Sequence, residues 1–175
     1  MTPAPMLSAQ VICKNLAMVG DITLDAVDKR ILAALQQHGR ITYDELAAGI
    51  GLSASATLRR VKRLEECGVI TGYVALVAPE RVGLGLTAYI NVRLSKHSDQ
   101  GSPIEAFTAA IQTWPEVVEC AALTGEMDYL LQVLVRDMAH YSHFIMDALL
   151  KHPAVQDCKT SFMLRRLKGT TAVPL

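Results

Sequence analysis

Apolar residues recur every three or four positions in the first third of the chain and predict three short helices. The first covers about 25–37. The second begins at Thr42, because Thr42 and Glu45 have the spacing of a capping box, in which each side chain bonds the backbone N–H of the other residue. A tight turn over 51–53 follows, with Ser53 placed to cap the third helix.

The third helix is apolar along only one stripe. Leu58, Val61 and Leu64 recur at helical spacing and are predicted to point into a core. The opposite side and its flanks carry small residues first and basic residues afterwards, namely Ser55, Ala56, Arg59 and Arg63, flanked by Arg60 and Lys62. Such a helix can approach a DNA groove with its N-terminus and meet phosphates along its length. The pattern predicts a helix-turn-helix, with the β-branched segment 69–74 as its wing.

A basic run on a helix also has a simpler interpretation. Four of the five positions 59–63 are basic, and such runs usually form a solvated face. The capping signals upstream and the wing downstream favour a DNA-binding domain, because together they complete a small folded unit. The candidate DNA contacts are Arg40, Ser53, Ser55, Ala56, Thr57, Arg59, Arg60, Lys62 and Arg63.

The second half of the chain alternates instead of following a helical period. After a linker over 78–85 that contains Pro and Gly, residues 86–95 place apolar side chains on one face and polar ones on the other. Further strands are predicted over 117–123, 129–135 and 155–164, with helices after Pro103 and over 138–150. The order βαββαβ is that of the ferredoxin-like fold, so the chain is predicted to be α+β.

Two helices can cover only one face of such a sheet. The third strand is apolar on both sides, most clearly at Leu130, Leu131, Val133, Leu134 and Val135. A second copy of the chain is the simplest cover for the open face, and a two-fold dimer is the usual arrangement. A homodimer also suits the DNA hypothesis, because it presents two recognition helices to a symmetric site.

Short motifs are spread over both halves of the chain. The first half contains Leu24-Asp25-x-x-Asp28-x-x-Ile31-Leu32, Gly39-Arg40-Ile41, Leu52-Ser53, Arg59-Arg60-Val61-Lys62-Arg63-Leu64-Glu65 and Gly68-Val69-Ile70-x-Gly72-Tyr73. The second half contains Pro79-Glu80-x-x-Gly83, Thr124-Gly125-Glu126-x-Asp128-Tyr129 and the closing Thr160-Ser161 and Lys168. Over about residues 22–172 they closely resemble the Lrp/AsnC family of bacterial and archaeal regulators. The resemblance implies dimers that assemble further, to tetramers or octamers.

The turn over 125–128 has two interpretations. A hairpin turn by itself favours Gly and Asp on backbone grounds. The resemblance implies that this loop lines an effector cleft between dimers, where backbone N–H groups near Gly125 can bind the carboxylate of an amino acid and Asp128 its ammonium group. The expected effector contacts are Thr124, Gly125, Glu126, Met127, Asp128, Tyr129, Thr160 and Ser161.

Composition narrows the function further. The 175 residues carry a formal net charge of +0, which disfavours unspecific coating of nucleic acid and suits a local basic helix. No apolar run approaches the ~20 residues of a membrane span. The four cysteines form no CxxC pair, so neither a disulfide framework nor a zinc site is indicated. His140 and His143 stand at i and i+3 without a further ligand nearby in sequence, which favours solvated residues over a metal site.

The predicted function is a cytoplasmic, nucleoid-associated transcriptional regulator that binds double-stranded DNA and responds, without a cofactor, to an amino acid or related metabolite. One alternative is an architectural DNA-binding protein without a ligand, which differs only at 125–129. The other is an enzyme, which is disfavoured because the chain has no Gly-rich phosphate loop, nucleophile elbow or catalytic Cys/His pair.

The predicted organisation has five parts. They are a disordered extension over 1–22, a winged helix-turn-helix domain over 23–77, the linker over 78–85, a ferredoxin-like effector-binding and oligomerisation domain over 86–168, and a tail over 169–175. A start codon placed upstream of Met18 is an alternative explanation of the extension. The tail resembles that of one proteobacterial branch of the family, which implies amino-acid catabolism or sulfur amino acids.

Overall fold

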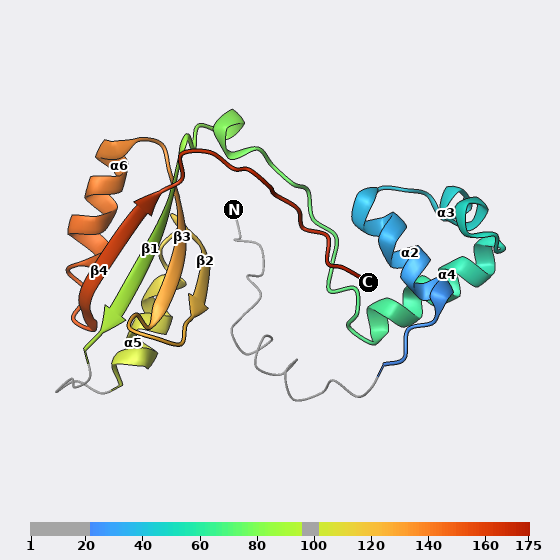
Figure 1. Ribbon diagram of the computed structural model, residues 1–175, viewed down its shortest axis with the longest axis horizontal. Coiled ribbons are helices and arrows are strands. Elements are labelled where there is room, and N and C mark those ends of the chain that lie inside the picture. The colour runs from blue at the N-terminus through green and yellow to red at the C-terminus, as the bar shows by residue number, and fades with distance from the viewer. Residues whose placement is uncertain (1–21, 96–101) are drawn as a thin grey trace. The chain divides into compact units, whose positions relative to one another are not determined.

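The computed structural model describes residues 22–95 and 102–175. The expected disordered extension therefore lies outside the described residues, except for Ile22. The described chain forms two compact units, each with its own hydrophobic core. The first contains 22–75 together with 170–175, and the second contains 76–95 and 102–169 (Figure 1).

The first unit is built from three capped helices, α2 (Ala26–Gln37), α3 (Tyr43–Ile50) and α4 (Ala54–Glu66). The capping box predicted at Thr42 and Glu45 is confirmed, with backbone N–H to side-chain distances of 2.9 and 3.2 Å. Ser53 caps α4 as predicted, because its hydroxyl accepts the N–H of Ala56 at 3.3 Å. Each cap satisfies helix N–H groups that have no partner inside the helix.

The apolar stripes of these helices meet in one core. Its buried members are Ile31, Leu32, Leu46, Ile50, Val61 and Leu64. Burying one such side chain stabilises the fold by roughly 1.5–3 kcal/mol. The core therefore sets which side of α4 faces inward and which side is left for a partner.

The predicted wing does not form a strand. Val69 and Ile70 fold back onto the end of α4, where both N–H groups bond the carbonyl oxygen of Leu64 at 2.9 and 3.0 Å. From there to Ala78 the described chain has no ladder partner, and β-branched residues alone do not make a strand without one. Residues 69–74 thus follow α4 at the place expected for the wing, but they do not form a strand.

The second unit has the predicted βαββαβ order. Its elements are β1 (Leu86–Leu94), α5 (Pro103–Ile111), β2 (Val117–Ala122), β3 (Tyr129–Val135), α6 (Met138–His143) with a π-helical continuation (Phe144–Leu149), and β4 (Val155–Phe162). The strands form one antiparallel sheet in the order β2-β3-β1-β4. The ferredoxin-like, α+β prediction is confirmed.

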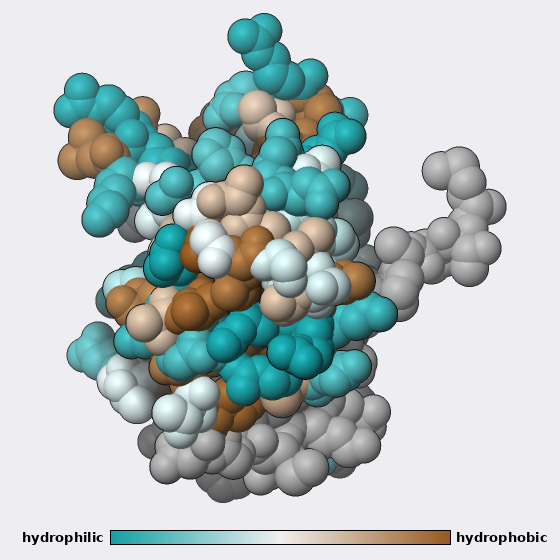
Figure 2. Space-filling model, turned by 90° about the vertical axis from the view of Figure 1, so that its right-hand side faces the viewer, coloured by the Kyte–Doolittle hydropathy of each residue, from teal (hydrophilic) through white to brown (hydrophobic). Residues whose placement is uncertain are grey.

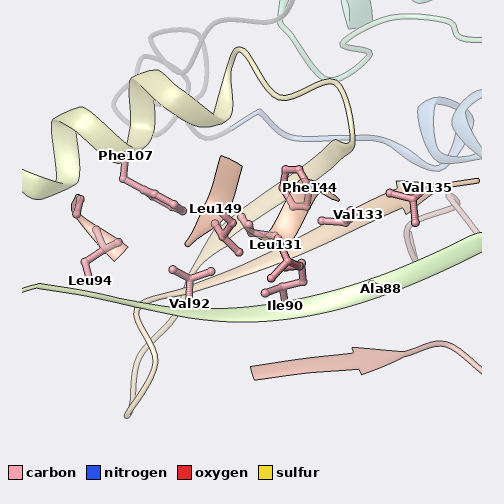
Figure 3. Packing of buried hydrophobic residues seen from close by; sticks show 12 residues of the cluster. Ala88, Ile90, Val92, Leu94, Phe107, Leu131, Val133, Val135, Phe144 and Leu149 are labelled. Carbon is pink, nitrogen blue, oxygen red and sulfur yellow. The ribbon is translucent and has the colours of Figure 1, made fainter. Parts of the chain in front are cut away.

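Side chains alternate across this sheet. Those of one face point toward α5 and the α6 segment, where Phe107, Phe144 and Leu149 close the core (Figure 3). Ile90 lies opposite Leu131 in the β1–β3 register, and both are fully buried. The other face holds polar and apolar residues together, among them Tyr89, Asn91, Leu130, Gln132 and Leu134. The open face is therefore more polar than the sequence of β3 alone predicted.

Before β1, the chain forms a short 3-10 turn (Pro79–Val82) that ends at Gly83, where φ is 84°. Pro fixes the start of this turn and Gly tolerates the left-handed end. Among the described residues, no helix is both long and apolar enough to cross a bilayer.

Candidate nucleic-acid interface and ligand cleft

The N-terminus of α4 presents small polar groups to solvent. Ser53 and Ser55 are exposed, and their hydroxyl oxygens lie 3.2 Å apart. Ala56 follows on the same side and is half-buried. Hydroxyls and N–H groups at a helix N-terminus can donate to phosphate or to base edges.

Arg59 and Lys62 are two exposed cations of α4. Neither takes part in an ion pair among the described residues, whereas their basic neighbours do. Arg40, just before α3, is exposed as well and is likewise unpaired in the described part of the chain. These side chains are therefore available to a negatively charged partner.

Arg60 and Arg63 bind acidic residues of α2. Arg60 Nη1 lies 2.7 Å from Asp25 Oδ2 and 2.8 Å from Asp28 Oδ1, and Arg63 pairs with the second oxygen of Asp28. The side chain of Asp28 is only 1% exposed. The N–H of Asp28 and the Arg60 guanidinium hold the pKa of Asp25 below its usual value, and the two carboxylates raise the pKa of Arg60. These two arginines orient α4 on α2.

The predicted DNA contact at Thr57 does not fit the structure. Thr57 is fully buried, and its hydroxyl donates to the carbonyl oxygen of Ser53 at 3.0 Å. Because α4 turns by about 100° per residue, Thr57 shares the inward side with Val61 and Leu64. A hydroxyl that bonds one turn back along its own helix holds the helix start and cannot reach DNA.

Figure 2 shows one face of the molecule coloured by residue hydropathy. Hydrophilic residues cover most of the visible surface, and hydrophobic residues form smaller patches between them.

The second unit contains an open cleft of about 750 Å³. It lies where the ends of β1 and β2 meet the turn before β3 and the start of α5. Its walls are formed by Arg93, Leu94, Ser95, Ser102, Pro103, Ile104, Ala122, Leu123, Gly125, Glu126, Asp128, Tyr129 and Gln156. Small-molecule sites commonly have volumes of about 300–1,000 Å³ and a few convergent polar groups within apolar walls.

The carboxylate of Asp128 bonds the backbone through one of its two oxygens. Its Oδ2 accepts the N–H of Leu94 at 2.7 Å, while no bond to Oδ1 is seen within the described residues. Gly125 adopts a φ of 125°, which side-chain-bearing residues rarely take, although a Cβ there would meet no atom within 4 Å. Glycine is needed at this turn for backbone conformation and not for space.

Arg93 holds the turn from the side of β1. Its Nε donates to the carbonyl oxygen of Glu126 at 3.1 Å, and Nη2 lies 3.8 Å from the sulfur of Met127. A guanidinium has five N–H donors, so these contacts leave others unused. The cleft therefore brings a cation and a carboxylate to one ligand-sized space.

The structure brings together only part of the predicted effector set. Gly125, Glu126, Asp128 and Tyr129 line the cleft, whereas Thr124, Met127, Thr160 and Ser161 do not. Thr160 turns toward α6 and accepts the hydroxyl of Tyr141 at 2.8 Å. Ser161, one residue later, lies on the opposite face beside Tyr89. Neighbouring strand residues alternate in direction, so Thr160 and Ser161 cannot both face one ligand.

Sequence reasoning missed Arg93, Gln156 and the start of α5. Val92 pairs with Tyr129 in the β1–β3 register, and Val92 also pairs with Cys158 of β4. This register places the end of β1 beside the Gly125 turn. Strand pairing was thus the signal that would have found Arg93, and the sequence alone did not provide it.

The two histidines singled out by spacing face different carboxylates. His140 Nε2 lies 3.0 Å from Glu116, and His143 Nδ1 lies 2.7 Å from Asp147. Within 22–95 and 102–175, no three His, Cys, Asp or Glu residues are grouped so as to hold a metal ion.

Comparisons with known proteins match both units. A family model described as Lrp/AsnC ligand binding domain matches residues 87–173, and one described as winged helix-turn-helix DNA-binding matches residues 24–71. The leucine-responsive regulatory protein of Rhizobium meliloti is 39% identical over 158 residues, which are 90% of this chain and 100% of that protein.

Solved structures agree with these matches. A transcriptional regulator of Neisseria meningitidis in complex with L-Met is 49% identical, with a TM-score of 0.83 over 87% of this chain and 97% of that one. An AsnC family transcriptional regulator of Agrobacterium tumefaciens is 34% identical, with a TM-score of 0.79 over 86% and 97%. The ranges matched by the family models contain the α4 surface and the cleft.

Proposed function

The chain belongs to the Lrp/AsnC family of transcriptional regulators, and from this premise we propose that it binds DNA through α4 and an amino acid in the cleft beside Gly125. The observation that carries the ligand proposal is the meeting of Arg93 and Asp128 at one ligand-sized cleft. An amino acid has one anionic and one cationic group, and this pair can match both. The protein then acts by binding and needs neither catalysis nor a cofactor.

On the DNA side, the basic residues have two roles, because some contact DNA and others hold α4 in place. Arg59 and the Ser55 region enter the major groove, while Lys62 and Arg40 contact phosphates. Arg60 and Arg63 keep α4 in position, because both bind the carboxylate of Asp28. Arg63, whose side chain is 49% exposed, can still reach a phosphate from that position.

For the ligand we propose an apolar amino acid, with L-methionine as the first candidate. Besides its charged pair, the cleft offers apolar surface from Leu94, Ile104, Leu123 and Tyr129. The ring of Tyr129 is held by Phe107, with ring centroids 5.2 Å apart. The regulator of Neisseria meningitidis, which is 49% identical, was solved with L-Met. In this arrangement Asp128 Oδ1 receives the ammonium group, and Arg93 with the N–H groups near Gly125 receives the carboxylate.

Titration calorimetry against the twenty amino acids tests the ligand. We expect heat from L-methionine, and we expect Asp128→Asn to weaken binding by about tenfold or more, since hydrogen bonds to charged groups contribute about 1.5–3 kcal/mol. Asn keeps an oxygen for the N–H of Leu94, so the loop stays folded. Asp147→Asn, on the α6 segment outside the cleft, is the matched control. Equal affinity of Asp128→Asn and wild type would remove the ammonium site.

We further propose that the regulator is a homodimer that assembles to a tetramer or octamer and works on the bacterial nucleoid, in the cytoplasm, where its DNA partner lies. Large apolar side chains support a second copy. Val74, Leu76 and Val77 are 84%, 75% and 62% exposed, and Leu164 and Leu167 are 99% and 82% exposed. A monomer in water rarely leaves so many large apolar groups uncovered.

Selection from a random pool of DNA duplexes tests the DNA proposal. We expect the wild-type protein to enrich a pseudo-palindromic site, and L-methionine to change either the affinity for that site or the oligomer size measured by light scattering. Binding of many unrelated sequences, without any response to amino acids, would favour the architectural alternative.

A further inference from the structure

The C-terminal segment belongs to the DNA-binding unit. Residues 170–175 group with 22–75, although 76–169 between them form the ligand-binding unit. The chain therefore passes between the two units twice, once after Ala75 and once after Gly169. The second connection, after Gly169, supplies no residue to the α4 surface or to the cleft.

One side chain of α2 binds this segment through both of its amide atoms. Gln36 Nε2 donates to the carbonyl oxygen of Val173 at 3.2 Å, and Gln36 Oε1 accepts the N–H of Val173 at 2.6 Å. A neighbouring strand satisfies the same two backbone groups in the same way. Gln36 thus takes the place of a strand partner.

The segment lies along an apolar groove in the first unit. Alternate tail residues line it, as expected when one face of an extended segment turns inward. They are Thr171, Val173 and Leu175. The facing wall comes from α2 and from the residues after α4, mainly Leu32, Leu35, Val69 and Ile70. These wall residues belong to the core of the unit or pack against it, so the groove is a fixed feature of the fold.

This contact is shallow. Val173 and Leu175 remain 62% and 47% exposed, and a space of about 270 Å³ is left along the groove. Two hydrogen bonds and partial burial are weak enough to form and break without unfolding the unit. The segment can therefore exist in docked and undocked states.

We propose that residues 170–175 are a releasable clasp, which in its docked state ties the DNA-binding unit to the ligand-binding unit a second time. The clasp limits the positions open to the winged helix-turn-helix and so fixes the spacing of the two recognition helices in a dimer. The clasp follows β4 in the chain, and Gln156 near the start of that strand lines the ligand cleft. One strand thus connects the cleft to the clasp. The spacing role rests on the proposed dimer.

Hydrogen exchange of the full-length protein tests docking without any DNA. We expect the Val173 amide to be protected in the wild type and to exchange at the rate of a free chain in Gln36→Ala. Gln36→Glu keeps the acceptor and loses the donor, so it should protect Val173 only in part. The neighbouring Gln37→Ala is the control and should leave protection unchanged. Fast exchange of Val173 in the wild type would overturn the clasp, whatever the protein binds.

Cross-linking tests which chain supplies the clasp. In a Cys13→Ser, Cys67→Ser background, Gln36→Cys with Val173→Cys should give, on oxidation, a disulfide within one chain that runs as a monomer on a denaturing gel. Covalent dimers from this variant would show that the segment comes from a second copy and would overturn the same-chain clasp. The two single variants control for other pairings.

Operator spacing tests the role in regulation. On the duplex selected by the wild type, moving the half-sites apart by about five base pairs puts them on opposite sides of the helix. We expect a chain ending at Gly169, and Gln36→Ala, to lose about fivefold or more of the wild-type preference for the original spacing, the lower end of usual coupling between sites. Gln37→Ala should keep the full preference. A truncated chain with unchanged preference would show that the clasp does not control spacing.

Discussion

Asp28 lies fully buried at the start of α2 and is bonded by the N–H of Asp25 and by the guanidinium groups of Arg60 and Arg63. These contacts assign two of the four basic residues of α4 to holding that helix on α2. Sequence reasoning could not separate them from Arg59 and Lys62, because all four are basic and adjacent. The separation depends on which side of α4 meets the acidic start of α2, which is a tertiary contact.

Asp28→Ala should lower the free energy of unfolding of the first unit by about 2–4 kcal/mol, because it removes a buried partner of two cations and one half of a capping box. The freed guanidinium groups should raise affinity for unrelated DNA and steepen its salt dependence by about one to two in the log–log slope. Urea unfolding and binding at several salt concentrations measure both effects. Asp44→Asn, an exposed carboxylate on α3, is the control.

Arg59→Ala and Lys62→Ala should weaken DNA binding in different ways. Loss of a base-contacting Arg59 should cost on the order of 1–3 kcal/mol and relax sequence preference, whereas loss of a phosphate-contacting Lys62 should weaken all sequences alike and flatten the salt dependence. Anisotropy titrations with operator and scrambled duplexes separate the two outcomes. Normal operator binding by Arg59→Ala would mean that another surface reads the bases.

At the scale of elements, local signals predicted most of the fold. Capping residues and apolar spacing located α2, α3 and α4, alternation located β1, and the other three strands were also predicted close to their observed bounds. Residues 69–74 form no strand, because a strand needs a partner and a β-branched sequence does not supply one. The π-helical end of α6 was also beyond sequence reasoning, since the residues from Phe144 to Leu149 are ordinary helix formers with a helical period.

The caps make the first unit sensitive to acid. Hydrogen bonds from the N–H and the hydroxyl of Thr42 lower the pKa of Glu45, and those from Asp28 and Arg60 lower the pKa of Asp25. A carboxyl whose folded pKa is lowered stabilises the fold above its ordinary pKa, and that contribution disappears as the pH falls through the lowered value. The relevant window therefore lies below the ordinary values of 4.5 for Glu45 and 3.8 for Asp25.

Glu45→Gln should flatten this acid dependence, because Gln keeps the capping geometry but does not titrate. Urea midpoints followed by circular dichroism between about pH 5 and pH 3 should fall less in Glu45→Gln than in the wild type. Tryptophan fluorescence is the internal control, since the single Trp, Trp114, packs in the core of the second unit. An identical slope in both proteins would contradict the assignment to Glu45.

At the scale of the whole molecule, sequence order was a poor guide to the candidate site and to the unit that contains the tail. Gly125 and Asp128 were predicted as one loop, and both line the cleft. Arg93 and Gln156 reach the same cleft from about 30 residues on either side, which only strand register determines. The expected separate tail over 169–175 instead lies almost wholly in the first unit.

The open sheet face predicts that residues 76–169 dimerise by themselves. Leu130 and Leu134 of β3 lie on this face, and α5 and the α6 segment cover only the other. Sedimentation velocity at micromolar concentration should show a dimer for 76–169, and Leu134→Glu should shift it toward monomer because it buries an unpaired charge. Met146→Lys, at an exposed position on the α6 segment, should leave the dimer intact. A monomeric 76–169 would move the interface to the segments around Val74.

The discontinuous first unit also bears on the order in which the protein is made. Translation delivers α2, α3 and α4 first, then all of 76–169, and only afterwards the residues that dock beside Gln36. Domains generally fold as units while synthesis proceeds from the N-terminus. A nascent chain on the ribosome can therefore expose a folded recognition helix. The groove that receives Val173 in the first unit stays empty until the ligand-binding unit has been synthesised. Residues 170–175 complete the first unit, although they are synthesised after the whole of the second.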